Sequence, residues 1–222
     1  MLIGMDFDNT IVCYDDVFHR IALEQGLIPP QLPIGKGSVR DYLRQMQREE
    51  AWIELQGTVY GSRIEESDPF PGVVEFLARC RQKGMGVCII SHKTRNPFRG
   101  PLFDLHQAAH QWLEHHSFFD PSWVGLSRTQ VYFELTKEEK LNRIGSSGCT
   151  HFIDDLPEFL LEPSFPPQVK RILFDPNGNG SSGQRLRLGD ASPQPSGQGR
   201  PLARATSWEE VGQMIFGKGV LS

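Results

Sequence analysis

Short apolar runs that end in carboxylate or hydroxyl side chains restrict the possible folds of this chain more than any other feature of its sequence. Three of them lie at residues 2–8, 86–91 and 150–155. Two further apolar runs lie at residues 131–133 and 169–174. A short continuous apolar run is typical of a strand that is buried on both faces of a parallel sheet. We therefore predict a strand at each of these positions.

Amphipathic helical patterns separate the predicted strands. Apolar residues recur at helical spacing over residues 73–80 and 105–112, and Asp104 is a suitable N-cap for the second of these helices. Thr136 and Glu139 have the spacing of a capping box, which predicts a helix after Thr136. Strands that alternate with helices predict a doubly wound parallel sheet with both faces covered, and hence the α/β fold class.

Residues 14–67 depart from this alternation, because they contain helical patterns and no strong strand. The patterns predict one helix around residues 17–22 and another over residues 38–55. We interpret residues 14–67 as a small helical insert that covers the strand ends as a cap. The α/β core then consists of residues 1–13 and 68–222.

Residues 176–204 are rich in glycine, serine and proline and almost free of large apolar side chains. A segment of this composition buries too little apolar surface to become well ordered, so we predict a mobile surface loop. After it, Thr206 and Glu209 have the spacing expected at the start of a last helix.

Charge and cysteine content narrow the class of protein. The formal net charge is −4, which gives no basic surface for a nucleic-acid backbone. The apolar runs are shorter than the roughly 20 residues of a membrane span, and no signal peptide is visible. The four cysteines are widely spaced, which favours reduced thiols. We therefore expect a cytoplasmic protein with neither a nucleic-acid nor a membrane partner.

Asp6 and Asp8 are the sharpest candidates for a functional site. Two carboxylates at positions i and i+2 lie on the same side of an extended chain, and at the end of a buried strand their proximity is costly without a cation. An ordinary strand-to-turn junction is the alternative interpretation. Ser91 and Asp154 end two other predicted strands. Because ligands bind outside the carboxyl ends of parallel strands, we predict a site at this edge of the sheet.

The chain resembles the haloacid dehalogenase superfamily, in its phosphatase type. Residues 6–10, Asp-Phe-Asp-Asn-Thr, resemble the first signature of that superfamily, which is an aspartate, a spacer, a second aspartate and then a threonine. Residues 87–91 are similar to the second signature, and residues 152–155 to the fourth in its paired-aspartate form. The third signature is a lysine near the start of the preceding helix, and both Lys137 and Lys140 qualify.

The resemblance implies a Rossmannoid sheet with a cap and a reaction at phosphorus. Asp6 would attack phosphorus and form an aspartyl phosphate. Asp8 would protonate the leaving oxygen and later take a proton from the attacking water. Members that cleave carbon–halogen bonds typically lack an acid at the position of Asp8. Its presence therefore favours phosphoryl transfer over dehalogenation.

The resemblance also implies a magnesium ion, Mg2+. Its protein ligands would be Asp6, the backbone carbonyl of Asp8, and Asp154, with Asp155 in a supporting role. Magnesium prefers oxygen ligands and usually takes one or two carboxylates, which agrees with this set. Ser91 would hydrogen-bond a phosphoryl oxygen, and a lysine would neutralise charge on the nucleophile and the phosphate.

Lys137 and Lys140 are both candidates for the lysine that neutralises charge on the nucleophile and the phosphate. We favour Lys140 over Lys137, because its spacing to Asp154 and the sequence Lys-Leu-Asn-Arg-Ile that it begins look more like the family. A solvated surface charge is the default interpretation for either lysine.

Substrate binding is assigned to Thr10, Ser91 and His92. His92 begins the basic stretch 92–95, which directly follows a predicted strand, and loops at strand ends often determine specificity. A solvent-exposed basic loop is an equally good interpretation of that stretch.

The expected function is Mg2+-dependent hydrolysis of a phosphate monoester of a small metabolite. A phosphomutase or phosphotransferase of the same superfamily is one alternative, since it would also use Asp6 and a cap. A non-catalytic phosphate-binding module is another, although it would not need an acid at Asp8. The cap and the loops determine the substrate, and the sequence leaves it open.

Overall fold

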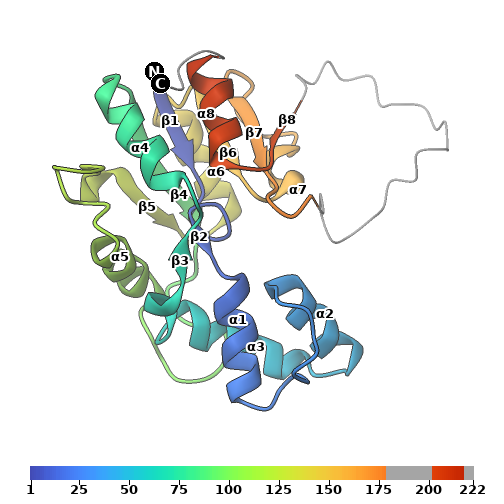
Figure 1. Ribbon diagram of the computed structural model, residues 1–222. Coiled ribbons are helices and arrows are strands. Elements are labelled where there is room, and N and C mark those ends of the chain that lie inside the picture. The colour runs from blue at the N-terminus through green and yellow to red at the C-terminus, as the bar shows by residue number, and fades with distance from the viewer. Residues whose placement is uncertain (179–201, 218–222) are drawn as a thin grey trace, which may run out of the picture.

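The computed structural model describes residues 1–178 and 202–217. Six parallel strands form its main sheet, in the spatial order β5-β4-β1-β6-β7-β8 (Figure 1). Their bounds are Leu2–Met5 (β1), Gly86–His92 (β4), Val131–Glu134 (β5), His151–Asp154 (β6), Lys170–Phe174 (β7) and Ala203–Ala205 (β8). This architecture confirms the predicted doubly wound α/β fold and a strand at each predicted position.

Both faces of the sheet are buried, as the continuous apolar runs predict. Along β4, Val87 and Ile89 belong to one core and Cys88 and Ile90 to the other, because successive side chains point to opposite faces. The first core is covered by helices α4, α5 and α8, and the second by α6 and α7. Their bounds are Val73–Gln82 (α4), Leu105–His115 (α5), Lys137–Ser146 (α6), Pro157–Leu160 (α7) and Trp208–Phe216 (α8).

Helices α5, α6 and α8 begin at side-chain caps. Asp104 accepts hydrogen bonds from two backbone N–H groups at the start of α5, and Thr136 forms a capping box at the start of α6, so both predicted caps are confirmed. The predicted cap of the last helix is wrong by one residue. Ser207, rather than Thr206, accepts from the N–H of Glu210, while Thr206 donates to the carboxylate of Glu210.

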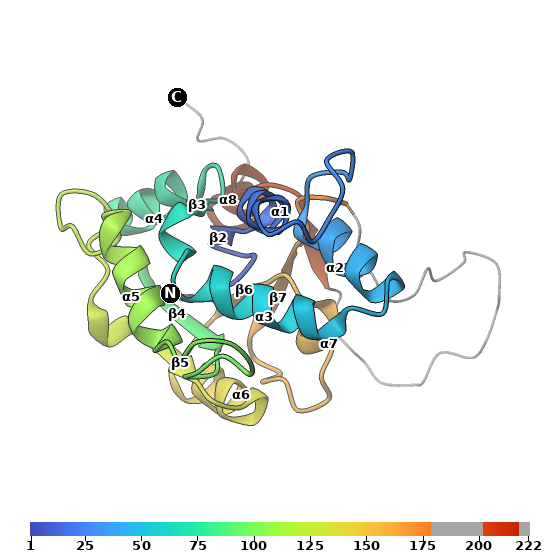
Figure 2. The same ribbon diagram turned by 90° about the horizontal axis from the view of Figure 1, so that it is seen from below.

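Helices α1 (Asp15–Glu24), α2 (Lys36–Gln45) and α3 (Glu49–Tyr60) lie beyond the carboxyl ends of the strands (Figures 1 and 2). They pack against one another, and the short antiparallel pair of β2 (Val12–Cys13) and β3 (Asp68–Pro69) stands where the chain enters and leaves them. This position suits a cap, and the division of the chain at residues 14 and 67 stays a prediction.

The single helix predicted over residues 38–55 is wrong. It is two helices, α2 and α3, which separate at Gln47, where φ is +56°. A non-glycine residue in this left-handed region ends a helix, and neither proline nor glycine marks the break in the sequence. A 3-10 turn at Ile64–Glu66 follows α3, and another at Arg128–Gln130 precedes β5.

The mobile loop predicted over residues 176–204 is only partly covered by the structure, because residues 179–201 lie outside the described ranges. At its C-terminal end the prediction is wrong, since β8 begins at Ala203 and pairs with β7. Within residues 1–178 and 202–217, no helix is long and apolar enough to span a membrane.

Candidate functional site

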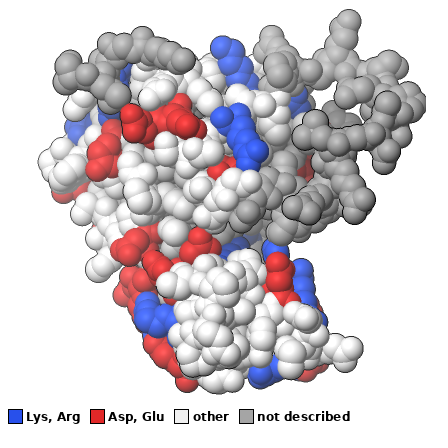
Figure 3. All heavy atoms as spheres, turned by 45° about the vertical axis from the view of Figure 1, so that its right-hand side comes forward, with Lys and Arg blue, Asp and Glu red and all other residues white. Residues whose placement is uncertain are grey.

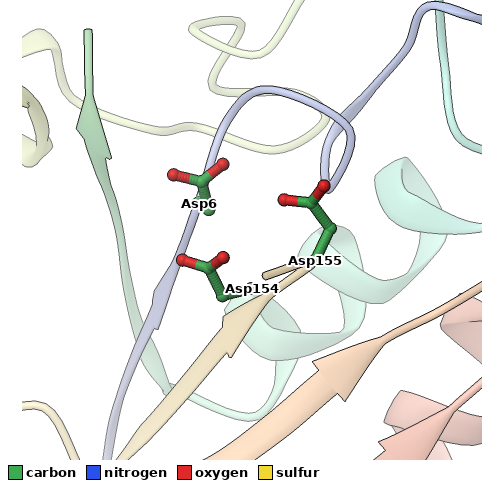
Figure 4. Close-up of side chains that lie close together, drawn as sticks. All are labelled: Asp6, Asp154 and Asp155. Carbon is green, nitrogen blue, oxygen red and sulfur yellow. The ribbon is translucent and has the colours of Figure 1, made fainter. Parts of the chain in front are cut away.

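Three carboxylates meet where β1 and β6 end. Asp6 directly follows β1, Asp154 ends β6, and Asp155 follows it. One carboxylate oxygen of each lies within 4.8 Å of the others, and Figure 4 shows the side chains turned towards a common space. The backbone N–H of Asp6 donates to the carbonyl of Ile153 at 2.8 Å, so pairing of the two strands brings these acids together.

A lysine from α6 joins two of the three carboxylates. Lys140 Nζ lies 2.6 Å from an oxygen of Asp6 and 2.6 Å from an oxygen of Asp154. Its side chain is buried. Burial lowers the pKa of Lys140, but Asp154 and Asp6 raise it more, and the ammonium stays charged. Lys137 is exposed and pairs instead with Glu162. Of the two candidate lysines, the structure brings Lys140 to the carboxylates.

Burial and mutual repulsion dominate the electrostatics of this carboxylate cluster. Burial raises the pKa of Asp154 to about 6, with Lys140 lowering it and Asp6 raising it. Burial, followed by the charges of Asp154 and Asp6, raises the pKa of Asp155 well above its ordinary value. One lysine therefore does not neutralise the three acids. A hard divalent cation with oxygen ligands fits this donor set.

The side chain of Asp8 contacts Lys93 and Tyr14 rather than the carboxylate cluster. Lys93 Nζ lies 2.9 Å from each of its carboxylate oxygens, and the hydroxyl of Tyr14 donates to one of them at 2.6 Å. Burial raises the pKa of Asp8, but the Lys93 ammonium and the Tyr14 hydroxyl lower it more, so the net shift is downward. The side chain of Asp8 is not part of the carboxylate cluster, and its predicted metal contact is through its backbone carbonyl.

The end of β4 presents alternate residues to opposite sides. Ser91 and Lys93 are buried, whereas His92 is exposed and its Nε2 lies 3.1 Å from the carbonyl of Leu135. The structure therefore does not bring His92 to Asp8 or to the carboxylate cluster. Strand alternation is the physical reason, and it makes Lys93 the member of the basic stretch that faces inward.

Thr10 is buried in the loop between β1 and β2, which also carries Asp6 and Asp8. Its carbonyl accepts a hydrogen bond from Trp208 Nε1 at 3.2 Å. Its hydroxyl has no partner among the residues that the structure describes. This orphan hydroxyl is compatible with the predicted binding role, which stays a prediction.

Sequence reasoning missed Tyr14 and Lys36 as site residues and left Lys93 undecided. Both Tyr14 and Lys36 belong to the helical segment, at the starts of α1 and α2. Lys36 Nζ donates to the side-chain oxygen of Asn9 at 3.1 Å. Burial lowers the pKa of Lys36, while Tyr60 and nearby carboxylates raise it more. Only the alternation of side chains after Ser91 could have indicated Lys93 in advance.

A cavity of about 600 Å3 opens between α2 and the ends of β6 and β7. Asn9, Tyr14, Lys36 and Asp155 are among its lining residues. Figure 3 shows acidic and basic side chains along the junction of the helical segment with the sheet. The cavity is large enough for more than a phosphate group, and it borders the carboxylate cluster through Asp155.

Solved structures share this fold. A haloacid dehalogenase-like hydrolase from Xanthomonas campestris matches with a TM-score of 0.50 and 11% identity, covering 97% of this chain and 94% of that one. A hydrolase of the haloacid dehalogenase (HAD) superfamily, subfamily IA, from Geobacter sulfurreducens matches with a TM-score of 0.50 and 11% identity, covering 96% of this chain and 95% of that one. A dehalogenase matches with a TM-score of 0.51 and 11% identity, covering 98% of this chain and 97% of that one. No protein-family model and no curated protein sequence matches the chain.

Proposed function

Because the chain has the fold of haloacid dehalogenase-superfamily hydrolases, we propose that it is a Mg2+-dependent phosphatase of small phosphate monoesters. The observation that carries this proposal is the position of Lys140 Nζ, 2.6 Å from both Asp6 and Asp154. A buried lysine held between a nucleophile and a metal ligand is what a transferred phosphoryl group requires, since that group brings negative charge to both.

Asp6 is the proposed nucleophile. Its carboxylate oxygen attacks phosphorus, a new P–O bond forms, and the bond from phosphorus to the leaving oxygen breaks. The product is an aspartyl phosphate and an alcohol. Lys140 orients the carboxylate of Asp6, because its ammonium bonds one oxygen and leaves the other for attack.

Asp8 is the proposed acid and base. It gives its proton to the leaving oxygen in the first step, and its carboxylate takes a proton from the water that attacks the aspartyl phosphate in the second. The second step breaks the bond between phosphorus and Asp6 and releases inorganic phosphate. A phosphoryl group beside Lys93 would share that ammonium with Asp8, which favours the protonated form of Asp8 that the first step needs.

Asp6, Asp154 and the backbone carbonyl of Asp8 would hold the magnesium ion, with Asp155 beside them. The ion supplies charge neutralisation and orientation of the phosphoryl oxygens when it is bound. Ser91, buried at the end of β4, is the proposed donor to a phosphoryl oxygen.

Release of phosphate from p-nitrophenyl phosphate tests the proposal. We expect turnover with magnesium, none with chelator, and loss of at least about 1000-fold in Asp6→Asn. Asp16→Asn is the matched control, because Asp16 is exposed on α1. Magnesium should also raise the melting temperature of the wild type, and less so in Asp154→Asn. A wild type that turns over no member of a broad phosphate-ester panel would contradict the proposal.

A further inference from the structure

Lys36 extends from the start of α2 to the loop that carries Asp6 and Asp8. Its Nζ lies 3.1 Å from the side-chain oxygen of Asn9. Three aromatic rings surround the ammonium, at 5.9 Å for Tyr14, 5.7 Å for Phe18 and 5.5 Å for Tyr60. These contacts fix a half-buried positive charge beside the proposed site.

This charge differs from those of the other two lysines at the site. Lys140 is ion-paired with Asp6 and Asp154, and Lys93 with Asp8. Within the described parts of the chain, Lys36 forms no ion pair with a carboxylate: its hydrogen-bond partners are the Asn9 amide and the Tyr60 hydroxyl, and Asp155 and Asp8 act on it without direct contact. Removing a cation from water without a directly paired counter-ion is costly, so an anion from a ligand in contact with Lys36 would be favoured here.

The cavity determines which part of a ligand meets Lys36. Lys36 lines it together with Asn9 and Asp155, whereas Asp6, Ser91 and Lys140 are not among its lining residues. A phosphoryl group at Asp6 would thus lie next to the cavity, and the rest of the ester would extend into it. In that arrangement Lys36 would face the leaving part of the substrate.

The cavity also contains carboxylates, most of which have partners of their own. Asp15 accepts from the backbone N–H of Lys36 at 2.8 Å. Asp41 pairs with Arg40, and Asp175 with Arg204. Of the remaining two acids, Asp155 belongs to the carboxylate cluster and Glu158 is exposed. These pairings reduce the repulsion that an incoming anion would meet.

We propose that Lys36 selects phosphate monoesters whose leaving part carries a second anionic group, either a carboxylate or another phosphate. This inference rests on the proposed function, because it takes the scissile phosphate to lie at Asp6. A charge-assisted hydrogen bond to a group of this kind is short and strong, and a neutral analogue would leave Lys36 without it.

Three esters of a three-carbon alcohol provide the test. Glycerol phosphate has a neutral leaving part, phosphoglycerate replaces its terminal hydroxymethyl group by a carboxylate, and propanediol bisphosphate carries a second phosphate. In the wild type we expect kcat/KM for at least one charged ester to exceed that for glycerol phosphate by about 10-fold or more. The preferred charged ester identifies the anion.

Lys36→Met should abolish this preference, and Lys36→Arg should retain part of it. Lys83→Met is the matched control, because Lys83 is exposed on the far end of α4, and it should keep the full preference. A wild type without preference, or a Lys36→Met variant that keeps it, would overturn the inference.

Equilibrium binding separates failure of this inference from failure of the proposed function. Calorimetry in the Asp6→Asn background compares phosphoglycerate, propanediol bisphosphate and glycerol phosphate with Lys36 present or replaced by Met. Tighter binding of a charged ester that depends on Lys36 supports the inference even if no ester is hydrolysed. Equal binding of all three esters overturns it.

Discussion

Lys93 places its ammonium 2.9 Å from both carboxylate oxygens of Asp8, although the two residues follow different strands, β4 and β1, and lie 85 positions apart in the chain. Tyr14, at the start of α1, donates to the same carboxylate. Asp8 is thus oriented by one group from the end of β4 and by another from the helical segment. A displacement of that segment would change the environment of Asp8 directly.

Lys93→Met should lower kcat for p-nitrophenyl phosphate by about 100-fold. The variant loses the ammonium that fixes both oxygens of Asp8, so the proton donor is no longer held in place. Steady-state kinetics measure the effect, with Lys83→Met as the surface control. An unchanged kcat would mean that Asp8 does not depend on Lys93.

Lys140 and Lys137 lie one turn apart on α6 and should behave differently. Lys140→Met should lower kcat by about 1000-fold, because the buried pair of Asp6 and Asp154 loses its shared cation. Lys137→Met should change it less than about two-fold, since the pair of Lys137 with Glu162 is exposed. Phosphate release by both variants, checked for folding by circular dichroism, distinguishes them. Equal losses would contradict the assignment.

The alternation of strands and helices could be read from the sequence because each run obeys a local rule. The carboxyl ends of parallel strands share one edge, so the placement of Asp6 and Asp154 at the same edge followed from the predicted parallel sheet. That β1 and β6 are neighbours comes from the structure. The capping box at Thr136 and the N-cap at Asp104 are equally local. At Gln47 a single residue with positive φ separates α2 from α3, and the sequence around it carries no helix-stop signal strong enough to predict the break.

Contacts between the helical segment and the sheet could not be predicted in this way. Tyr14 and Lys36 reach the site only because α1 and α2 pack over the strand ends, and no spacing rule connects them to Asp8 or Asn9. Strand β8 was missed because three residues after a glycine-rich segment carry no periodic signal. Its place at the edge is set by tertiary pairing with β7.

Gly4 lies in the middle of β1, in contact with the core beneath the site. A Cβ there would come 2.7 Å from a ring carbon of Phe152 and 2.9 Å from Cys149 Sγ. Gly4→Ala should therefore lower the free energy of unfolding by about 1–3 kcal/mol through overpacking. Gly37→Ala, in α2 with open space around it, should be neutral or slightly stabilising. Urea denaturation measures both, and equal stabilities would contradict the packing.

His116, at the end of α5, should contribute to loss of stability in mild acid. Burial and the neighbouring His115 lower the pKa of His116 below 6.5, against smaller opposite effects of Ser67 and Asp68. As the pH falls below 6.5, the unfolded chain binds a proton that the folded protein resists, so stability declines until the folded pKa is passed.

The decline for His116 can be measured by urea denaturation at about pH 7.5 and about pH 5.5. Protonation of Asp154 and Asp155, whose pKa values are raised, stabilises both proteins over the same range, so the effect of His116 is the difference between them. His116→Phe should lose less stability than the wild type between the two pH values, since the ring stays beside Trp112 without a titrating group. His110 has a pKa lowered mainly by burial and adds to the decline in both proteins. An equal decline in wild type and variant would contradict the role of His116.

The most direct test of the account is chemical trapping of the intermediate during turnover. Borohydride reduces an aspartyl phosphate to homoserine, and peptide mass spectrometry locates the reduced residue. We predict homoserine at position 6 in the wild type with magnesium and p-nitrophenyl phosphate, and none without substrate. Reduction at another residue, or rapid turnover with no reduction at Asp6, would contradict the proposal that Asp6 is the nucleophile.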